Sequence, residues 1–128
     1  ARVTTWLVDT HAALWFLDDA PNLSARAKER MESGDSRLLV SAASLWEVAI
    51  KRRLGKIDVP DDLLDVLRDQ DFEVLPISAA HAWGVGQLPL GDHRDPFDRL
   101  LASQALLEGV PIISADREFE QYGVARLW

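Results

Sequence analysis

Residues 4–17 read TTWLVDTHAALWFL, and this stretch sets the pattern that the rest of the chain repeats. Its first part, Thr4 to Val8, is rich in β-branched and apolar residues and predicts a short strand that ends at Asp9. The part after Asp9 places apolar residues at helical spacing until the chain approaches Pro21. A strand followed at once by a helix is the building unit of a parallel sheet.

The same alternation recurs along the chain. Further short strands are predicted at residues 38–40, 73–76 and 111–114, with a weaker one at 124–127. Helices are predicted at residues 24–33, 44–54, 60–67, 78–85 and 95–108, and residues 87–94 form a loop. We therefore expect one α/β domain over residues 1–128, with a parallel sheet of four or five strands and helices on both faces.

Two of these helices have apolar stripes that predict their buried faces. In the helix that starts near Pro60, the stripe consists of Leu63, Leu64 and Leu67. In the last long helix, Leu100, Leu101, Ala105 and Leu106 are expected to point inward, and Gly109 is expected to end the helix.

The composition limits the classes of protein. The chain has 128 residues, 48% of them hydrophobic, which suits one domain with a real core. It contains no cysteine, which excludes disulfides and thiolate zinc sites. No apolar run approaches the roughly 20 residues of a membrane span, and no leader peptide is recognised, so a cytoplasmic protein is expected.

The charge is acidic, at −7 from 14 basic and 21 acidic residues. Nucleic-acid binders usually rely on Lys and Arg to neutralise phosphates, so this balance by itself disfavours that class. Divalent cations bound to carboxylates reverse the local sign of the field. An acidic chain is therefore compatible with a phosphate substrate if its acids hold metal.

Four acidic residues fall where a parallel sheet gathers functional groups. Asp9 follows the first predicted strand, Asp116 follows the fourth, and Glu47 lies in the first turn of the helix after the second strand. Because ligands bind beyond the carboxyl ends of the strands, these three acids should meet at one edge. Asp98 differs, because its helix leads into the fourth strand. Simple alternation places its start near the opposite edge, and the loop over residues 87–94 must bring it back.

Collected carboxylates point to a divalent cation. Mg²⁺ and Mn²⁺ prefer hard oxygen ligands, commonly one or two carboxylates with water and substrate phosphate. Such an ion activates bound water and stabilises charge on phosphate oxygens. Without it, four neighbouring carboxylates would repel one another, and some would stay protonated.

Each acid also has a purely structural interpretation. Residues 44–47, SLWE, match a capping box in which Glu47 only caps a helix. Asp95 before Pro96 is a natural N-cap, and Asp98 suits the reciprocal role less well than Glu would. The two acids that follow strands fit turn or N-cap positions. The functional interpretation therefore rests on the four acids occurring together.

Four blocks of the sequence resemble the PIN domain and, more narrowly, VapC-type toxins of bacterial toxin–antitoxin pairs. They are LVDTHAALW at residues 7–15, SLWEVAIK at 44–51, HRDPFDRLLA at 93–102 and SAD at 114–116. The resemblance covers essentially the whole chain in order and spacing. It implies a three-layer α/β/α sandwich around a parallel sheet, with an acidic site that binds Mg²⁺ or Mn²⁺.

The resemblance also assigns roles to the acids. Asp9, Glu47 and Asp98 match the three core acids of the family, and Asp116 matches the more variable fourth; all four are expected to be catalytic metal ligands. Asp95 is a supporting acid or a helix cap. The family cleaves RNA by attack of metal-bound water on phosphorus, which leaves a 5′-phosphate and a 3′-hydroxyl. A small antitoxin that covers the site and a homodimer are the implied partners.

The remaining candidates have open roles. Ser114 keeps a hydroxyl where many relatives have Thr, and it is expected to orient an acid or a bound water. Arg99 is either a phosphate contact or an ion-pair partner of nearby acids. His11 is expected to be structural. The basic patch is either a solvated helix face or an RNA contact, and it consists of Lys51, Arg52, Arg53 and Lys56.

Two rival functions remain to be weighed. One is a PIN-like module that binds a partner without significant nuclease activity, which the complete acid set disfavours. The other is a phosphotransfer receiver or aspartyl phosphohydrolase. A receiver needs an acidic pair after the first strand and a Lys after the last, but the chain has Asp9 alone and Arg117. A phosphohydrolase needs a second Asp where His11 stands.

Overall fold

The computed structural model describes residues 3–90 and 95–128 and contains one parallel sheet in the order β3-β2-β1-β4-β5. Its strands are β1 (Thr4–Val8), β2 (Ser36–Ser41), β3 (Phe72–Leu75), β4 (Ile112–Ile113) and β5 (Arg126–Leu127). The predicted parallel sheet is confirmed, including the weak fifth strand. Strand β1 is central and pairs with both β2 and β4.

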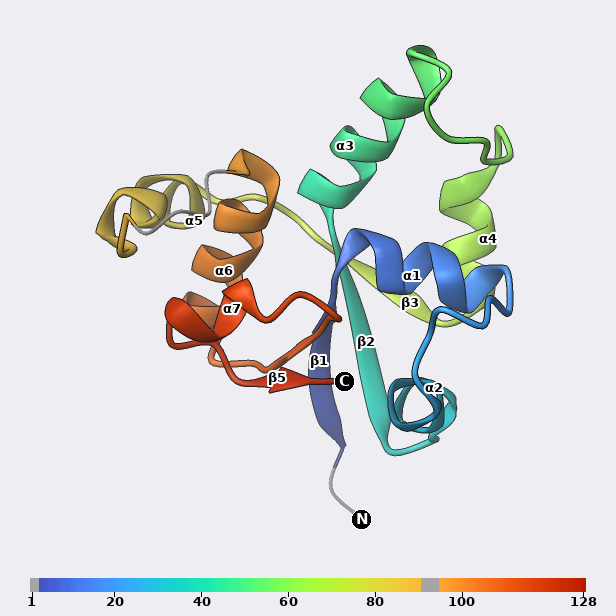
Figure 1. Ribbon diagram of the computed structural model, residues 1–128, viewed down its shortest axis with the longest axis horizontal. Helices are drawn as coiled ribbons and strands as arrows, with labels where there is room; N and C mark the ends of the chain where they lie inside the picture. The colour runs from blue at the N-terminus through green and yellow to red at the C-terminus, as the bar shows by residue number, and fades with distance from the viewer. Residues whose placement is uncertain (1–2, 91–94) are drawn as a thin grey trace.

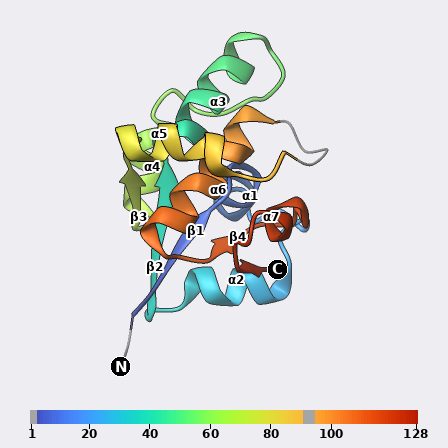
Figure 2. The ribbon, with the colours of Figure 1, turned by 90° about the vertical axis from the view of Figure 1, so that its left-hand side faces the viewer.

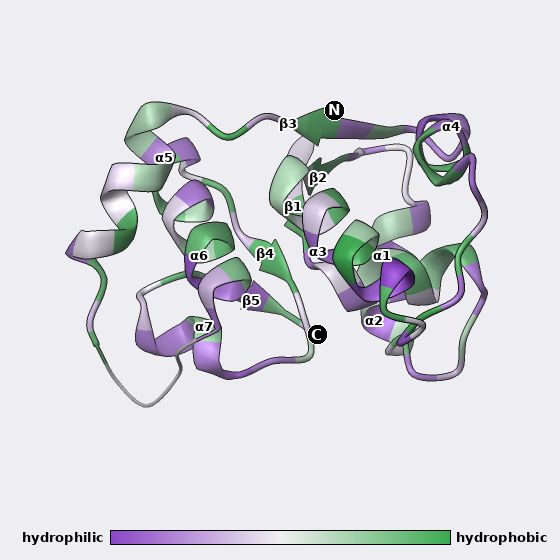
Figure 3. Ribbon diagram, turned by 90° about the horizontal axis from the view of Figure 1, so that it is seen from above, coloured by the Kyte–Doolittle hydropathy of each residue, from purple (hydrophilic) through white to green (hydrophobic). Residues whose placement is uncertain are grey.

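Helices cover both faces of the sheet. In Figure 1, α1, α2 and α4 lie on one side of β1 and β2, and α5, α6 and α7 lie on the other. Figure 2 faces the second group, and Figure 3 shows the strands between the two groups from above. The bounds are α1 (Thr10–Leu17), α2 (Ala25–Glu32), α3 (Ala42–Arg53), α4 (Leu63–Asp69), α5 (Ala79–Gly84), α6 (Pro96–Glu108) and α7 (Glu118–Gln121).

Two apolar cores follow from the alternation of side chains along the strands. In β1, Leu7 belongs to the core that includes Leu101 of α6. The next residue, Val8, belongs to the core that includes Ala13 of α1. Both strand residues are fully buried. The central strands are buried on both faces, as expected when helices cover both sides of a parallel sheet.

The start of α3 differs from the prediction. The helix begins at Ala42, and Ser41 is its N-cap, with its hydroxyl accepting from the Ala43 N–H at 3.0 Å. Ser41 has extended backbone because it also ends β2. The predicted opener, Ser44, is therefore inside the helix, and Glu47 lies in the second turn. The capping-box interpretation of Glu47 is wrong.

The predicted buried stripes are only partly correct. Leu63 and Leu67 of α4 are buried, but Leu64 is 36% exposed. In α6, Leu101 is buried, whereas Leu106 is 43% exposed. Each helix contacts its core through a narrower face than the apolar residues suggested. The short helix α7 and a 3₁₀ turn over Val85–Gln87 were not predicted.

Two glycines serve the packing of α6. Gly109 has φ +66° and ends the helix in the left-handed conformation, as predicted. Gly84 lies where α5 meets α6, and a Cβ there would lie 2.6 Å from Ser103 Oγ. Part of the predicted 87–94 loop, residues 91–94, lies outside the described residues. Among the described helices, none is long and apolar enough to span a membrane.

Candidate active site

Asp9 is fixed at the carboxyl end of the central strand. It is the N-cap of α1, where the Ala12 N–H donates to its Oδ1 at 2.8 Å, and the Ser114 hydroxyl donates to its Oδ2. Only 8% of the residue is exposed. Burial raises the pKa of Asp9 above its ordinary value, although both hydrogen bonds act to lower it. Capping and a functional role are thus compatible at this residue.

Ser114 connects Asp9 to Asp116. Its Oγ, which donates to Asp9, also accepts from the Asp116 N–H at 3.0 Å. The negative charge of Asp116 further raises the pKa of Asp9, so the two carboxylates lie within electrostatic reach of each other. The Glu118 N–H donates to Asp116 Oδ1 at 2.9 Å and fixes the turn into α7. The structure thus brings the Ser114 hydroxyl onto an acid, and the role of Ser114 in the site stays a prediction.

Glu47 is buried beside the start of α1. It is 5% exposed, and its Oε1 lies 2.9 Å from Thr10 Oγ1, which is also 2.8 Å from Ser44 Oγ. Its Oε2 accepts from Lys51 Nζ at 2.8 Å, one turn further along α3. Because Thr10 follows Asp9 directly, this contact ties Glu47 to the same strand end as Asp9.

Asp98 lies in the first turn of α6, beside α3. Asp95 caps the helix by accepting from the Phe97 and Asp98 N–H groups at 2.9 and 3.3 Å, which confirms its capping role. The ring of Phe97 meets that of Trp46 edge-on, with centroids 5.0 Å apart. Trp46 and Phe97 immediately precede Glu47 and Asp98, so the ring contact places these two acids on facing turns of α3 and α6.

The expectation that α6 begins at the opposite edge is wrong. A helix that leads into a parallel strand must run back along the sheet, so it starts at the carboxyl edge and ends at the amino edge. Helix α6 does this, with its first turn beside α3 and its last turn leading to β4 (Figure 2). The short helix α5 packs against α6 and does not form a separate crossing of the sheet.

The donor set of this edge fits a hard divalent cation. Carboxylates are the ligands that Mg²⁺ and Mn²⁺ prefer, and a buried carboxylate with a raised pKa, as at Asp9, gains from a nearby cation. Within residues 3–90 and 95–128, no three His, Asp or Glu side chains stand close enough to ligate one ion as now arranged. Both oxygens of Glu47 already contact groups of the chain itself, Thr10 and Lys51.

The other predicted residues lie around this edge with contacts of their own. The Arg99 guanidinium donates to the Pro89 carbonyl at 3.1 Å and stacks 5.5 Å from the Tyr122 ring centroid, so its described contacts secure the segment before α6. His11 is exposed, with its ring 5.8 Å from that of Trp15. In the basic patch, Arg52 pairs with Asp61. Substrate roles for Arg99 and the patch stay predictions.

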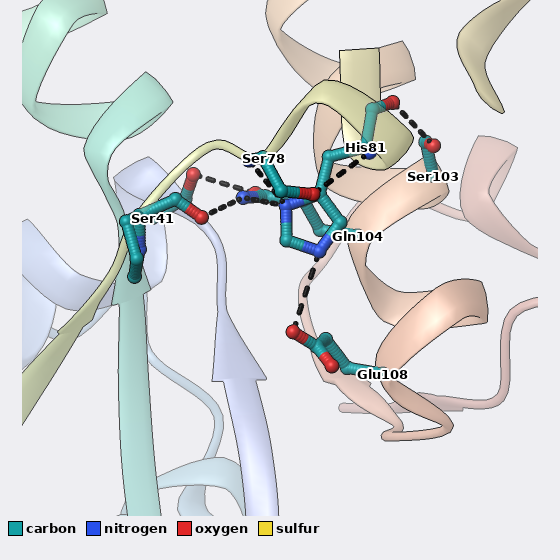
Figure 4. A network of polar contacts seen from close by, with 7 residues as sticks. Ser41, Ser78, His81, Ser103, Gln104 and Glu108 are labelled. Carbon is teal, nitrogen blue, oxygen red and sulfur yellow. Dashed lines mark hydrogen bonds and ion pairs between the residues drawn. The ribbon is translucent and has the colours of Figure 1, made fainter. Parts of the chain in front are cut away.

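A second buried polar cluster, the Gln104 network, joins the end of β2 to α5 and α6 (Figure 4). Gln104 is fully buried; its Oε1 accepts from the Ser41 hydroxyl at 2.6 Å, and its Nε2 donates to the Pro76 carbonyl at 3.3 Å. His81 accepts from the Ser78 N–H through Nδ1 at 3.0 Å, and its Nε2 lies 3.3 Å from Glu108.

Sequence reasoning missed Thr10 and Gln104, and it missed the contact of Lys51 with Glu47, although Lys51 was named in the basic patch. Lys51 had a usable signal, because Glu47 and Lys51 stand at the i, i+4 spacing that favours ion pairs on a helix. Thr10 had a weaker one, as a hydroxyl directly after Asp9. Gln104 had none, because its partner Ser41 lies 63 positions away in the sequence.

Comparison with known proteins places the chain in a family. The ribonuclease VapC22 of Mycobacterium tuberculosis is 28% identical over 122 residues, which cover 94% of this chain and 93% of that protein. The DNA-bound VapBC structure from Salmonella typhimurium matches with a TM-score of 0.72 and 23% identity, over 98% of this chain and 97% of the matched one.

The structure of VapBC2 from Rickettsia felis, bound to a promoter DNA fragment, gives a TM-score of 0.73 at 16% identity, over 97% of this chain and 98% of the matched chain. These likenesses carry the same fold over nearly the full length of each chain. The model of the PIN domain family matches residues 6–125. The chain therefore belongs to the PIN domain family.

Proposed function

We propose that this chain is a divalent-metal-dependent endoribonuclease that acts as the toxin of a toxin–antitoxin pair. Its family membership and its full-length similarity to a protein named as a ribonuclease support this proposal. The observation that carries it is Asp9, a buried carboxylate oriented at the end of the central strand by Ser114 and the Ala12 N–H. Burying a carboxylate costs stability, and buried carboxylates with a raised pKa cluster at functional sites.

We assign the metal ligands to Asp9, Glu47, Asp98 and Asp116, with Mg²⁺ or Mn²⁺ as the ion. The bound ion would lower the pKa of a water ligand and stabilise negative charge on the phosphate. The chain's own groups orient the acids: Ser114 holds Asp9 and the backbone of Asp116, and Thr10 holds Glu47.

Cleavage of RNA by the purified chain tests this function. The wild-type protein should cleave single-stranded RNA in the presence of Mn²⁺ and leave 5′-phosphates on the products. Cleavage should stop when EDTA is added. Asp9→Asn and Asp98→Asn should each reduce kcat/KM at least about a hundredfold, because each removes a charged ligand. Asp69→Asn, at an exposed acid that ends α4, is the control of equal charge change and should cleave normally.

Equal cleavage by all four proteins would indicate a contaminating nuclease and would remove the support for this mechanism. A well-folded wild type that binds a protein partner but never cleaves RNA would instead be a partner-binding module of the same fold.

We propose a small antitoxin and a second copy of the chain as protein partners, and the cytoplasm as the place of action. Structures similar to this chain are described as VapBC complexes. Helix α3 and its C-cap also carry an exposed apolar row at four-residue spacing, consisting of Trp46, Ile50 and Leu54 at 58%, 39% and 63% exposure. Co-expression with the product of an adjacent short reading frame should give a stable complex that suppresses cleavage; free, active toxin under those conditions would contradict this partner.

A further inference from the structure

Glu47 is an acid of the candidate site whose two carboxylate oxygens both contact groups of the chain itself. Thr10 Oγ1 lies 2.9 Å from one carboxylate oxygen, and Lys51 Nζ lies 2.8 Å from the other. The Glu47 side chain is 6% exposed, whereas that of Lys51 is 35% exposed. The pair therefore joins a buried carboxylate to a lysine whose side chain is partly exposed.

The ammonium of Lys51 also interacts electrostatically with acids at the start of α6. The pKa of Lys51 is raised chiefly by its hydrogen bond to Glu47, and the negative charges of Asp95 and Asp98 at the start of α6 raise it further. Lys51 is thus a cation of the chain that lies among acids from both α3 and α6. These acids include two of the four proposed metal ligands.

We propose that Lys51 is the resident counter-ion of the acid site, the cluster formed by Asp9, Glu47, Asp98 and Asp116. In this role Lys51 competes with the divalent cation for Glu47 and so sets the affinity of the enzyme for the metal. The inference rests on the proposed function and adds a control element to it. A divalent ion that takes Glu47 Oε2 must first displace the ammonium, because the two cations cannot share the position that Lys51 Nζ holds.

The chemistry of lysine suits this role. Its ammonium is a compact point charge on a flexible stem, so it can leave the carboxylate without moving the helix. The Lys51 side chain is already partly exposed, so a displaced ammonium has solvent nearby to hydrate it. While paired, it offsets the repulsion among the acids of α3 and α6, so that the ion-free fold keeps a buried Glu47 at a lower cost.

Mn²⁺ binding to the full-length chain, measured by titration calorimetry, tests the proposal. Lys51→Met removes the ammonium but keeps most of the stem, and it should lower the Kd for Mn²⁺ about threefold to tenfold. Arg53→Met is the matched control: it removes one positive charge from an exposed residue in the last turn of the same helix. It should shift the Kd less than twofold, as should Lys51→Arg, which keeps a cation beside Glu47.

A double-mutant cycle assigns the effect to Glu47. In a Glu47→Gln background the carboxylate is gone, so adding Lys51→Met should no longer tighten Mn²⁺ binding. Thermal unfolding of each variant checks that it is folded, and Lys51→Gln provides a second neutral variant that must move the Kd in the same direction.

Tighter binding by Lys51→Met and Lys51→Gln, lost in the Glu47→Gln background, would establish the competition. Wild type that cleaves RNA and binds Mn²⁺ no more weakly than Lys51→Met would overturn the role of Lys51 and leave the proposed function intact. Wild type that neither binds Mn²⁺ nor cleaves RNA would overturn both.

Discussion

The acid site and the Gln104 network both lie at the carboxyl edge of the sheet, after β1 and β2, and they differ in the kind of group that they bury. The acid site buries carboxylates, and at Asp9 burial raises the pKa because the charged form is disfavoured. The Gln104 network buries neutral groups that satisfy one another: Gln104 is fully buried, and its side chain has a donor and an acceptor partner.

This difference indicates that the Gln104 network has a structural role and the acid site a functional one. A satisfied neutral network stabilises a fold and defines how its elements meet, whereas a buried charge costs stability unless something binds it. The network joins the N-cap of α3 to α6, the two helices that carry Glu47 and Asp98. The network thus fixes the position of α3 relative to α6, and this position determines where Glu47 and Asp98 lie relative to each other.

Removing the network should have the largest effect on stability. Gln104→Leu keeps the volume but leaves the Ser41 hydroxyl and the Pro76 carbonyl without their buried partner, so the free energy of unfolding should fall by about 2 kcal/mol. Urea unfolding followed by tryptophan fluorescence measures this change. Gln87→Leu, at an exposed glutamine, is the control and should stay within about 0.5 kcal/mol of wild type. Equal stability of the two variants would show that the network is not a structural brace.

Neutralising Asp9 should change the free energy of unfolding by a smaller amount and in the opposite direction. Asp9→Asn keeps an N-cap acceptor for the Ala12 N–H but removes a desolvated charge, so the metal-free protein should be about 1 kcal/mol more stable near pH 7. In our proposal the same substitution lowers kcat/KM at least about a hundredfold. A less stable Asp9→Asn protein would mean that the carboxylate is a structural group like Gln104.

The pH dependence of the stability gained by Asp9→Asn tests whether burial of the Asp9 charge causes that gain. Because the folded protein holds a proton on Asp9 more tightly than the unfolded chain does, protonated Asp9 favours the folded state below its ordinary pKa of 3.8, and this advantage is lost as the pH rises through the raised folded pKa. The stability difference between Asp9→Asn and wild type should therefore grow across that window and level off above it. A difference independent of pH would exclude burial of the charge as its cause.

Local patterns in the sequence were enough for the strands, for the helices except α7 and the 3₁₀ turn, and for the edge at which three of the acids lie. Runs of β-branched and apolar residues, each followed by apolar residues at helical spacing, predicted the parallel sheet. The ends of the predicted strands placed Asp9 and Asp116 at one edge of that sheet. Glu47 was placed at the correct edge although the N-cap of its helix is Ser41, three residues before the predicted Ser44. A serine that ends a strand and caps a helix has no local signal that distinguishes it from the next serine.

The remainder depended on contacts between distant segments. Asp98 was joined to the site by family resemblance, whereas the direction of α6 follows from the geometry of parallel crossovers and was misjudged. The partners of Gln104 lie 63 and 28 positions away, and no periodicity encodes them. Thr10 and Ser114 hold acids that are 37 and 105 positions distant, so their roles emerge only when β1, α3 and β4 are packed together.

Anomalous scattering from crystals of the chain soaked in Mn²⁺ is the most direct test of the acid site as a metal centre. We predict an anomalous difference peak bounded by the carboxylates of Asp9 and Asp98, with Glu47 or Asp116 turned toward it, and no such peak in crystals of Asp9→Asn. Crystals with Mn²⁺ bound only elsewhere, or the same peak retained in Asp9→Asn, would contradict the account.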